Sequence, residues 1–367
     1  AVRTDPAASA APAVDWSTAV VDSTMKRSSP TTLGGWGYTQ GLFLYGTYLV
    51  FQRTHNPAYL AYIKAWADRF VQPDGSISNS FNSLDSMNSG NVLLVLFKET
   101  GQARYKTAAT KIRNRLKTYP RTSDGGFWHA TGASRAHQLW GDGVFMVDPF
   151  LSRYGVIVGE KAYADDETSK QLMVTYKHLL NPANGLLKHA FDESKSASWA
   201  NKSTGQAPET WCRAEGWFMM ATTEVLENIA PNHPNRGALV TIVANLVKAV
   251  SKFQDPKTGL WWQIVDRPGA NGNFLETSCS SMYTYVISRA VERGYVDASF
   301  KAVASKGYQG VLTRVSKGSD GLANVSGICI GTNVGNAAYY YSRPRKTNDL
   351  HGLGSFLIMN EQLARTS

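Results

Sequence analysis

The sequence is poor in cysteine. Its 367 residues include three, Cys212, Cys279 and Cys329. This is too few for a disulfide scaffold, and none has the CxxC spacing of common zinc sites. At most one disulfide can form, and any two of the three cysteines could form it. The longest apolar run, residues 92–97, is far shorter than the roughly 20 residues that span a bilayer, so we expect no membrane helix.

Several motifs of catalytic and binding sites are also missing. There is no GxxxxGK[ST] phosphate loop, no HExxH zinc motif and no GxSxG nucleophile turn. The seven histidines are scattered, so a metal cluster is not expected. The basic stretch at 343–346 is short and has no recognition motif beside it, which predicts a solvated loop and no nucleic-acid partner.

The composition is that of a folded, basic protein. Apolar residues make up 43% and charged residues 18%, which excludes disorder of the whole chain. The net charge of +10 attracts polyanions, whether nucleic acid, acidic glycan or anionic lipid, or serves solubility alone.

The start of the chain indicates secretion. Residues 1–12 are rich in Ala and Pro, and we expect a flexible extension left after removal of a secretory signal, although another kind of chain boundary would look the same. Glycosylation sequons at Asn201 and Asn324 agree with secretion.

Helical patterning dominates. Strand-like alternation is short and confined to places such as 260–265, and no Pro- or Ser-rich linker divides the chain, so we predict one domain over residues 1–367. Apolar residues recur at three- and four-residue spacings in twelve segments: 14–25, 41–54, 59–71, 91–99, 105–119, 143–154, 170–180, 216–229, 238–253, 281–294, 299–315 and 352–364.

A turn recurs between these segments. Asp, Asn or Thr precedes a glycine and a short apolar run, with the glycines at Gly75, Gly125, Gly185, Gly259 and Gly321. Each interval has room for one helical hairpin, and six hairpins would close into an (α/α)6 barrel. The predicted fold class is therefore all-α, with an open solenoid of hairpins as the alternative.

Polar and aromatic residues are concentrated where the helices begin. In a closed barrel these starts would meet at one rim, where paired carboxylates could act on glycosidic bonds and aromatic faces could stack on sugar rings. The residues concerned are Asp85, Asp142, Arg213 and Glu276, with Trp36, Tyr38, Trp140, Trp211 and Trp217 around them.

Each of these residues also has a structural interpretation. An Asp at a helix start is commonly a cap, and Trp or Tyr at helical spacing commonly belongs to the core. Asp142, however, lies between Gly141 and Gly143. Glycine on both sides is poor helix chemistry and indicates the close approach of a ligand or another backbone.

Two basic side chains need partners. Arg213 lies in an otherwise apolar stretch, so we expect an anion beside it. That anion could be a protein carboxylate, Glu215 or Glu276, or a substrate carboxylate. His189 could contact a ligand or be a satisfied loop histidine.

At these residues the sequence resembles the unsaturated rhamnogalacturonyl hydrolases of glycoside hydrolase family 105 and, more distantly, the unsaturated glucuronyl hydrolases of family 88. The resemblance runs from residue 36 to residue 356. The matching segments are 124–129 (DGGFWH), 138–143 (QLWGDG), 146–155 (MVDPFLSRYG), 211–217 (WCRAEGW) and 342–352 (SRPRKTNDLHG).

The resemblance implies an (α/α)6 barrel and hydration of an enol ether. Lyases leave a 4,5-unsaturated uronic acid at the non-reducing end of their products, and the family hydrates that double bond, after which the hemiketal opens and releases the next sugar. Asp142 would protonate C4 and then deprotonate the attacking water. Asp85 would position Asp142 and keep it protonated, so we expect the two carboxyls to titrate together with the pKa of Asp142 raised.

The resemblance also implies a binding site for an acidic unsaturated oligosaccharide, with no metal or organic cofactor. A basic chain suits such a substrate. The matching substrate-contacting positions are Tyr38, His129, Trp140, His189, Trp211, Arg213 and Trp217.

Two other classes of protein stay open. One is an ordinary inverting glycosidase on the same barrel, with carboxyls roughly 6.5–9.5 Å apart. The other is a non-catalytic glycan-binding toroid, which would bind an unsaturated saccharide without consuming it. The sequence sets no oligomeric state.

Overall fold

The computed structural model describes residues 13–366, so the extension expected at residues 1–12 lies outside the described residues. All twelve predicted helical segments are helices, which confirms the all-α fold class. A thirteenth, α12 (Ala337–Ser342), was missed because it is only one and a half turns long.

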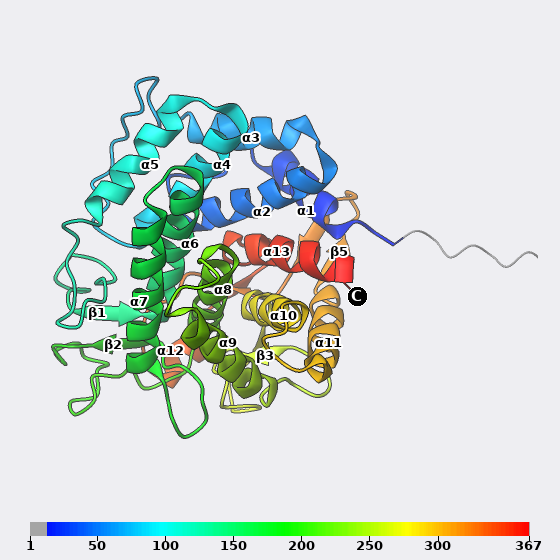
Figure 1. Cartoon of the computed structure of the whole chain (residues 1–367). Helices are drawn as coiled ribbons and strands as arrows, with labels where there is room; N and C mark the ends of the chain where they lie inside the picture. Colours follow the sequence, from blue (N-terminus) through cyan, green and yellow to red (C-terminus); the bar gives the residue numbers. More distant parts are fainter. Residues whose placement is uncertain (1–12, 367) are drawn as a thin grey trace, which may run out of the picture.

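Six helices form an inner ring and six lie outside it (Figure 1). The inner helices are α2 (Tyr38–Thr54), α4 (Gly90–Thr100), α6 (Gly141–Ile157), α8 (Cys212–Asn228), α10 (Thr277–Glu292) and α13 (Leu350–Thr366). The outer helices are α1 (Trp16–Arg27), α3 (Pro57–Ala67), α5 (Ala103–Arg115), α7 (Lys161–Leu179), α9 (Arg236–Ser251) and α11 (Lys301–Leu312).

The inner ring is closed. Each inner helix packs against the next one in chain order, and the last, α13, packs against the first, α2. Each outer helix covers one or two inner ones; α7 and α9, for example, both contact α8. The fold is therefore an (α/α)6 barrel, and the alternative of an open solenoid is excluded.

The predicted turn glycines are confirmed. Gly75, Gly125, Gly185, Gly259 and Gly321 all have positive φ, between 78° and 96°, a region that favours glycine. The helices are joined by loops that also hold two 3-10 turns, η1 (Asp85–Met87) and η2 (Ala298–Phe300).

Short antiparallel strand pairs stiffen the loops. The expected strand at 260–265 contains β3. The pairs are β1 (Gln138–Trp140) with β2 (Ala190–Asp192), β3 (Trp261–Trp262) with β4 (Leu275–Glu276), β5 (Val315–Lys317) with β6 (Ala323–Val325), and β7 (Ile328–Cys329) with β8 (Arg345–Lys346).

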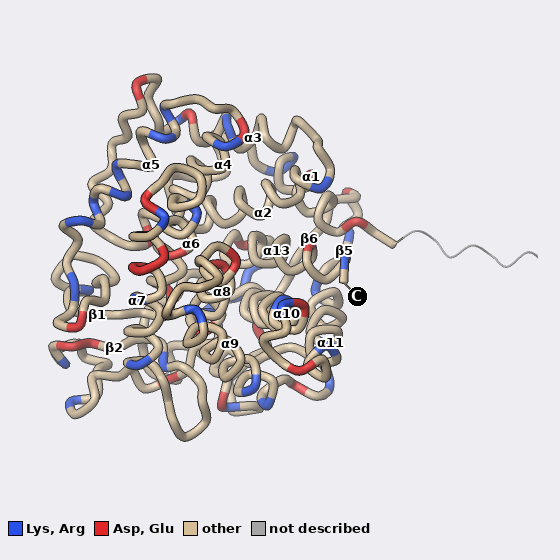
Figure 2. The backbone as a smooth tube through the Cα atoms, in the orientation of Figure 1, with Lys and Arg blue, Asp and Glu red and all other residues tan. Residues whose placement is uncertain are grey.

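Charged residues of both signs are mixed along the chain. Figure 2 shows Lys and Arg interspersed with Asp and Glu over inner and outer helices, rather than gathered in one stripe. Among the described helices, none combines the length and the apolar character needed to cross a membrane.

The seam between α2 and α13 depends on two glycines. A Cβ added to Gly354 would lie 2.5–2.8 Å from the side chain and backbone of Leu42, and one added to Gly46 would lie 2.9 Å from Leu357 Cβ. Neither distance is tolerated in packed proteins, so glycine lets the last inner helix approach the first and close the ring.

We expect Gly354→Ala to lower the free energy of unfolding by about 1–3 kcal/mol, because overpacking displaces the backbone of α2. The measurement is a denaturant or thermal melt. Gly237→Ala in α9 is the matched control, since a Cβ there meets nothing within 4 Å. It should be neutral or stabilising by up to about 1 kcal/mol. Equal effects of the two substitutions would contradict the tight seam.

Candidate active site

The starts of the inner helices meet at one mouth of the barrel. Tyr38 at the start of α2 contacts His351 at the start of α13, and Cys212 at the start of α8 is bonded to Cys279 in the first turn of α10. The positive ends of helix dipoles therefore point to one side of the barrel, which favours an anionic ligand there.

Asp142 lies in the first turn of α6 and is buried. The N-cap of α6 is Trp140, and no side chain there caps the helix, so Asp142 is not a cap. A Cβ on Gly141 would lie 2.9 Å from the Ala214 carbonyl oxygen, and one on Gly143 3.2 Å from His129 Nδ1. The predicted close approach of another backbone is confirmed at Gly141, whereas Gly143 is approached by side chains.

A hydrogen-bonded chain of three side chains begins at Asp142. Its Oδ1 lies 3.1 Å from His189 Nε2, and His189 Nδ1 lies 2.7 Å from the Tyr340 hydroxyl. His189 and Tyr340 are fully buried, so this chain is held in place. A neutral imidazole has two tautomers. His189 can therefore donate to an ionised Asp142 or accept from a protonated Asp142, and the hydrogen-bonded chain persists in both states.

Asp85 begins η1, just before α4, and 40% of its side chain is exposed. Its Oδ1 lies 3.6 Å from Nε2 of the buried His129. The His129 ring stacks on Trp140 with centroids 4.2 Å apart, and the Trp140 ring contacts His189 edge-on at 5.2 Å. Trp140 therefore lies between His129, which contacts Asp85, and His189, which contacts Asp142.

The two carboxyls interact, but the expected rise in the pKa of Asp142 is wrong. Partial desolvation within the mouth raises the pKa of Asp85, with His129 opposing and the negative charge of Asp142 adding to the rise. Burial also tends to raise the pKa of Asp142, but the attraction and hydrogen bond of His189 outweigh it and lower that pKa. In the free protein Asp142 is the stronger acid, because it has the closer histidine.

Arg213 has neither of the protein carboxylates expected for it. Its Nη1 donates to the Cys329 carbonyl at 2.6 Å and to Ser278, and its Nη2 donates to the Ile330 carbonyl at 2.8 Å. The guanidinium lies over the Trp211 ring at 4.7 Å. Only 1% of Arg213 is exposed, so in the free protein it holds the loop after β7 against α8.

The two glutamates named as possible partners have other tasks. Glu276 caps α10 by accepting from the amides of Ser278 and Cys279, and it also accepts from the Cys329 amide. Glu215 accepts from the Leu187 amide, and burial raises its pKa to about 8. A buried carboxyl with such a pKa is neutral near pH 7.

The remaining predicted residues lie along the same mouth. The Tyr38 hydroxyl is 2.8 Å from His351 Nε2, and His351 Nδ1 is 2.6 Å from Asp349. Trp211 contacts the His189 ring at 4.8 Å, whereas Trp217 stacks on Phe145 and is 1% exposed. Trp217 therefore supports the site from the core in the free protein.

Three residues of the candidate site were not expected from the sequence: Tyr340, Asp349 and His351. Tyr340 lies in α12, the missed helix, and is more than 150 residues from Asp142 in sequence. Asp349 and His351 stand within the matching segment 342–352, so their place at a helix start was an available signal.

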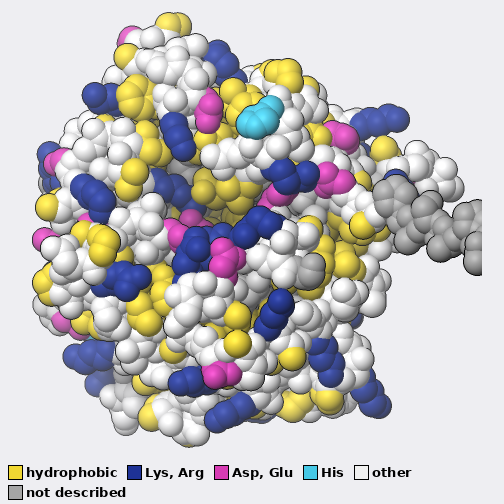
Figure 3. Space-filling view, turned by 45° about the vertical axis from the view of Figure 1, so that its right-hand side comes forward, with side chains coloured by type: hydrophobic (Ala, Val, Ile, Leu, Met, Phe, Trp, Pro, Cys, Tyr) yellow, Lys and Arg dark blue, Asp and Glu magenta, His cyan; other side chains and the backbone are white. Residues whose placement is uncertain are grey.

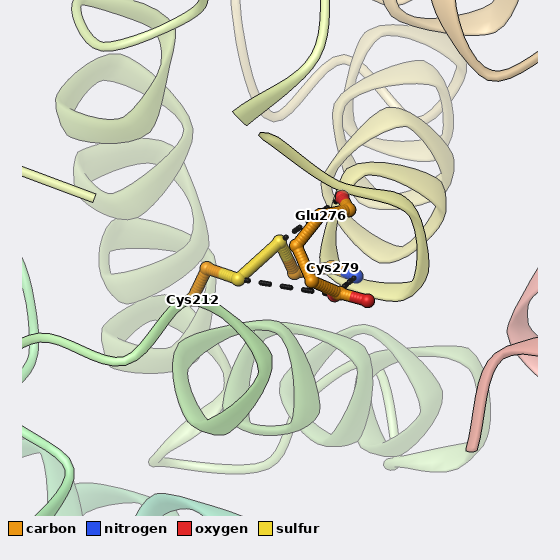
Figure 4. Close-up of side chains that lie close together, drawn as sticks. All are labelled: Cys212, Glu276 and Cys279. Atoms are coloured by element: carbon orange, nitrogen blue, oxygen red, sulfur yellow. Dashed lines mark hydrogen bonds between the residues drawn. A yellow bond between two sulfur atoms is a disulfide. The ribbon is translucent and has the colours of Figure 1, made fainter. Parts of the chain in front are cut away.

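A disulfide joins neighbouring inner helices beside this mouth. Cys212 and Cys279 are bonded, with Cα atoms 5.6 Å apart, and Figure 4 shows Glu276 next to the two sulfurs. Among the described residues, these three make up the one set of side chains close enough to ligate a metal ion. Cysteine binds a metal ion as a thiolate, so these three residues cannot hold a metal ion while Cys212 and Cys279 form a disulfide.

The opposite end of the barrel is also hollowed, with a cavity of about 420 Å³ between the ends of the inner helices. Figure 3 is turned toward the side where α13 ends and shows a hollow with acidic and basic side chains on its rim. The carboxylates there are paired: Glu224 with Arg153 at 2.6 Å and Glu227 with Arg289 at 2.8 Å. Such neutralised pairs offer poorer acid–base chemistry than Asp85 and Asp142.

Comparison with known proteins agrees with this geometry. A model described as Glycosyl Hydrolase Family 88 matches residues 16–366. A structure of a family 105 glycoside hydrolase from C. acetobutylicum is 35% identical, covers 96% of this chain and 100% of its own, and superposes with a TM-score of 0.91.

Two further relatives carry more specific names. Unsaturated rhamnogalacturonyl hydrolase YesR from Bacillus subtilis is 28% identical over 318 residues, which are 84% of this chain and 87% of YesR. An unsaturated glucuronyl hydrolase from a Bacillus species is 13% identical, covers 95% of each chain and shares the fold with a TM-score of 0.70.

The barrel and its carboxyl-bearing mouth define a glycoside hydrolase of the (α/α)6 class. The chain belongs to glycoside hydrolase family 105, which is related to family 88. The family resemblance found in the sequence is thereby confirmed.

The interaction of the two carboxyls gives a titration that can be measured. We expect Asp142→Asn to lower the pKa of Asp85, because the neutral amide removes the negative charge that favours the protonated form. Carboxyl-carbon NMR of Asp85 across a pH series measures the shift. Asp320→Asn, in an exposed turn, should leave the Asp85 titration where it is. An Asp85 pKa that is the same in wild type and Asp142→Asn would refute the coupling.

Proposed function

We propose that the protein releases 4,5-unsaturated uronic acid from the non-reducing end of lyase-generated oligosaccharides, rhamnogalacturonan fragments foremost, by hydrating the C4=C5 enol ether. The observation that carries the proposal is the pair of interacting carboxyls, Asp85 and Asp142, at the mouth where the inner helices begin. The name of the relative YesR supports the choice of substrate.

The proposed reaction needs one proton donor and one water. Asp142 gives its proton to C4, and the π electrons of C4=C5 form the new C–H bond. The positive charge at C5 is shared with the ring oxygen, and water adds to C5 while Asp142 takes back a proton. The C5 hemiketal then opens to a ketone, and the hemiacetal left at C1 releases the next sugar.

The charges of the free site indicate how this proton is held. Near neutral pH Asp142 is ionised, because its pKa is lowered, while Asp85 keeps a proton to higher pH. An incoming uronate carboxylate adds negative charge and displaces water, and both effects raise the pKa of a buried carboxyl. Asp142 would thus gain its proton when substrate binds, with the His189 and Tyr340 chain keeping its hydrogen bond in either state.

The other predicted residues have proposed parts in binding. Tyr38, His129, Trp140 and Trp211 contact the unsaturated ring, and the starts of six helices attract its carboxylate. Arg213 contributes its buried charge to the same mouth, and Trp217 supports Tyr38 edge-on at 6.3 Å.

We also propose an oxidising location outside the cytoplasm. The Cys212–Cys279 disulfide supports it, because disulfides persist in such compartments and are rare in reducing ones.

We expect Asp142→Asn to lower kcat by about 10²–10⁴ on an unsaturated uronate–rhamnose disaccharide, because it removes the proton donor. The assay follows the loss of the ultraviolet absorbance of the C4=C5 bond, and a thermal melt checks the fold. Asp320→Asn is the control for the substitution itself.

Three results would overturn the proposal. Asp142→Asn activity within about tenfold of wild type, less than the usual loss of a general acid, would remove Asp142 from the reaction. Cleavage of saturated glycosides with no loss of absorbance from unsaturated ones would favour the ordinary inverting glycosidase. Binding without any turnover would favour the glycan-binding toroid.

A further inference from the structure

A cavity of about 490 Å³ opens on the side of Trp140. Three loops form its walls, at 133–136, 196–199 and 333–334, and Trp140 and Gln138 belong to its lining. Its size lies within the range of sites that bind small molecules. Trp140 is the same ring that stacks on His129 and contacts His189, so the cavity shares a wall with the candidate active site.

Arg135 is the one charged side chain that lines this cavity within the described chain. It donates to the Ser134 carbonyl at 3.1 Å and to the Asn333 side chain at 3.3 Å, and it lies over the Trp140 ring at 4.8 Å. Both hydrogen-bond acceptors are neutral, and no described carboxylate forms an ion pair with Arg135. Its remaining N–H groups are therefore available to an anion that comes from outside the protein.

The charge of Arg135 reaches Asp85 and His129. Partial desolvation raises the pKa of Asp85, and the positive charge of Arg135 opposes this rise. Burial lowers the pKa of His129, and Arg135 lowers it further. The cavity is thus next to the mouth that holds Asp85 and His129, with Trp140 as the shared wall. A saccharide attached to the reacting sugar would extend into it.

The opposite side of the cavity suits a sugar ring. Trp199 is partly exposed and packs against the cluster of Trp140, Ala190 and Ala207. It also lines a second cavity of about 400 Å³, together with Lys188, so the hollow continues past its ring. Partly exposed indole faces bind pyranose rings by stacking, and the Asn333 amide nitrogen remains free to donate to a hydroxyl.

We propose that this cavity is the subsite for the leaving saccharide and that Arg135 binds an anionic group which that saccharide carries. The inference rests on the proposed function, since it concerns the part of the substrate beyond the unsaturated residue. Rhamnogalacturonan alternates uronate and rhamnose. The leaving part of an unsaturated tetrasaccharide therefore carries a carboxylate, and that of the disaccharide does not.

The test compares kcat/KM on the unsaturated tetrasaccharide and on the unsaturated disaccharide. The wild type should prefer the tetrasaccharide, and Arg135→Gln should reduce the ratio of the two values about tenfold or more, as expected for loss of a charge-assisted hydrogen bond. Arg135→Lys should reduce it less, because the charge remains while the two-pronged geometry is lost. Thermal melts confirm that each variant is folded.

Lys195→Gln is the matched control. Lys195 lies in the loop next to Ser196, is exposed and does not line the cavity, so its loss removes a charge from the neighbourhood without touching the subsite. The ratio should stay at its wild-type value. A drop in the ratio as large as that of Arg135→Gln would mean that these positive charges act by long-range attraction of the substrate and not by contact in the cavity, and it would overturn the proposal.

The other outcomes separate this proposal from the function on which it rests. Equal losses of Arg135→Gln on both substrates would place Arg135 against the unsaturated uronate itself and refute the subsite. Unchanged kcat/KM values of Arg135→Gln on both substrates would remove Arg135 from recognition altogether. If the wild type consumed neither substrate, the proposed function would be wrong, and calorimetry with the saturated rhamnose–galacturonate–rhamnose trisaccharide would still decide whether Arg135 binds its carboxylate.

Discussion

The closed ring of six inner helices is the constraint on which the rest of the structure depends. Gly46 and Gly354 let α13 approach α2 closely enough to complete the ring. Closure brings the helix starts to one mouth, where residues from distant parts of the chain meet: Tyr38 with His351, and Asp142 with His189 and Tyr340. An open array of the same hairpins would leave these groups apart. The candidate acid–base site thus depends on packing at the seam between α2 and α13.

At the mouth, two carboxyls of the same chemical type differ in proton affinity because their neighbours differ. Asp142 has a direct hydrogen bond to a buried histidine, whereas Asp85 has a longer contact and the negative charge of Asp142 nearby. Arg135 adds a positive charge on the side where the leaving saccharide would lie. The arrangement combines one group that gives up a proton readily with another that retains it, which is a usual requirement of acid–base catalysis.

Much of this could be predicted from the sequence, where local patterns carry the information. Helical periodicity located twelve helices, turn chemistry located five glycines with positive φ, and Gly141 and Gly143 signalled the close contact around Asp142. Periodicity failed at the start of α7, which begins at Lys161 rather than near residue 170, because its first turns bury polar residues such as Asp165 and Glu167. The pKa order and the partners of Arg213 depend on long-range contacts, His189 with Asp142 and Arg213 with the carbonyls after β7, which no local pattern reveals.

The central claim is that the enzyme hydrates C4=C5 and does not simply hydrolyse the glycosidic bond. Turnover of the unsaturated disaccharide in deuterated water, followed by NMR from the first minutes, tests it most directly. Hydration predicts a released keto acid that carries one deuterium at C4, in a single stereochemical position, with the double bond gone. A released uronate that keeps its double bond and has no deuterium at C4 would contradict the account.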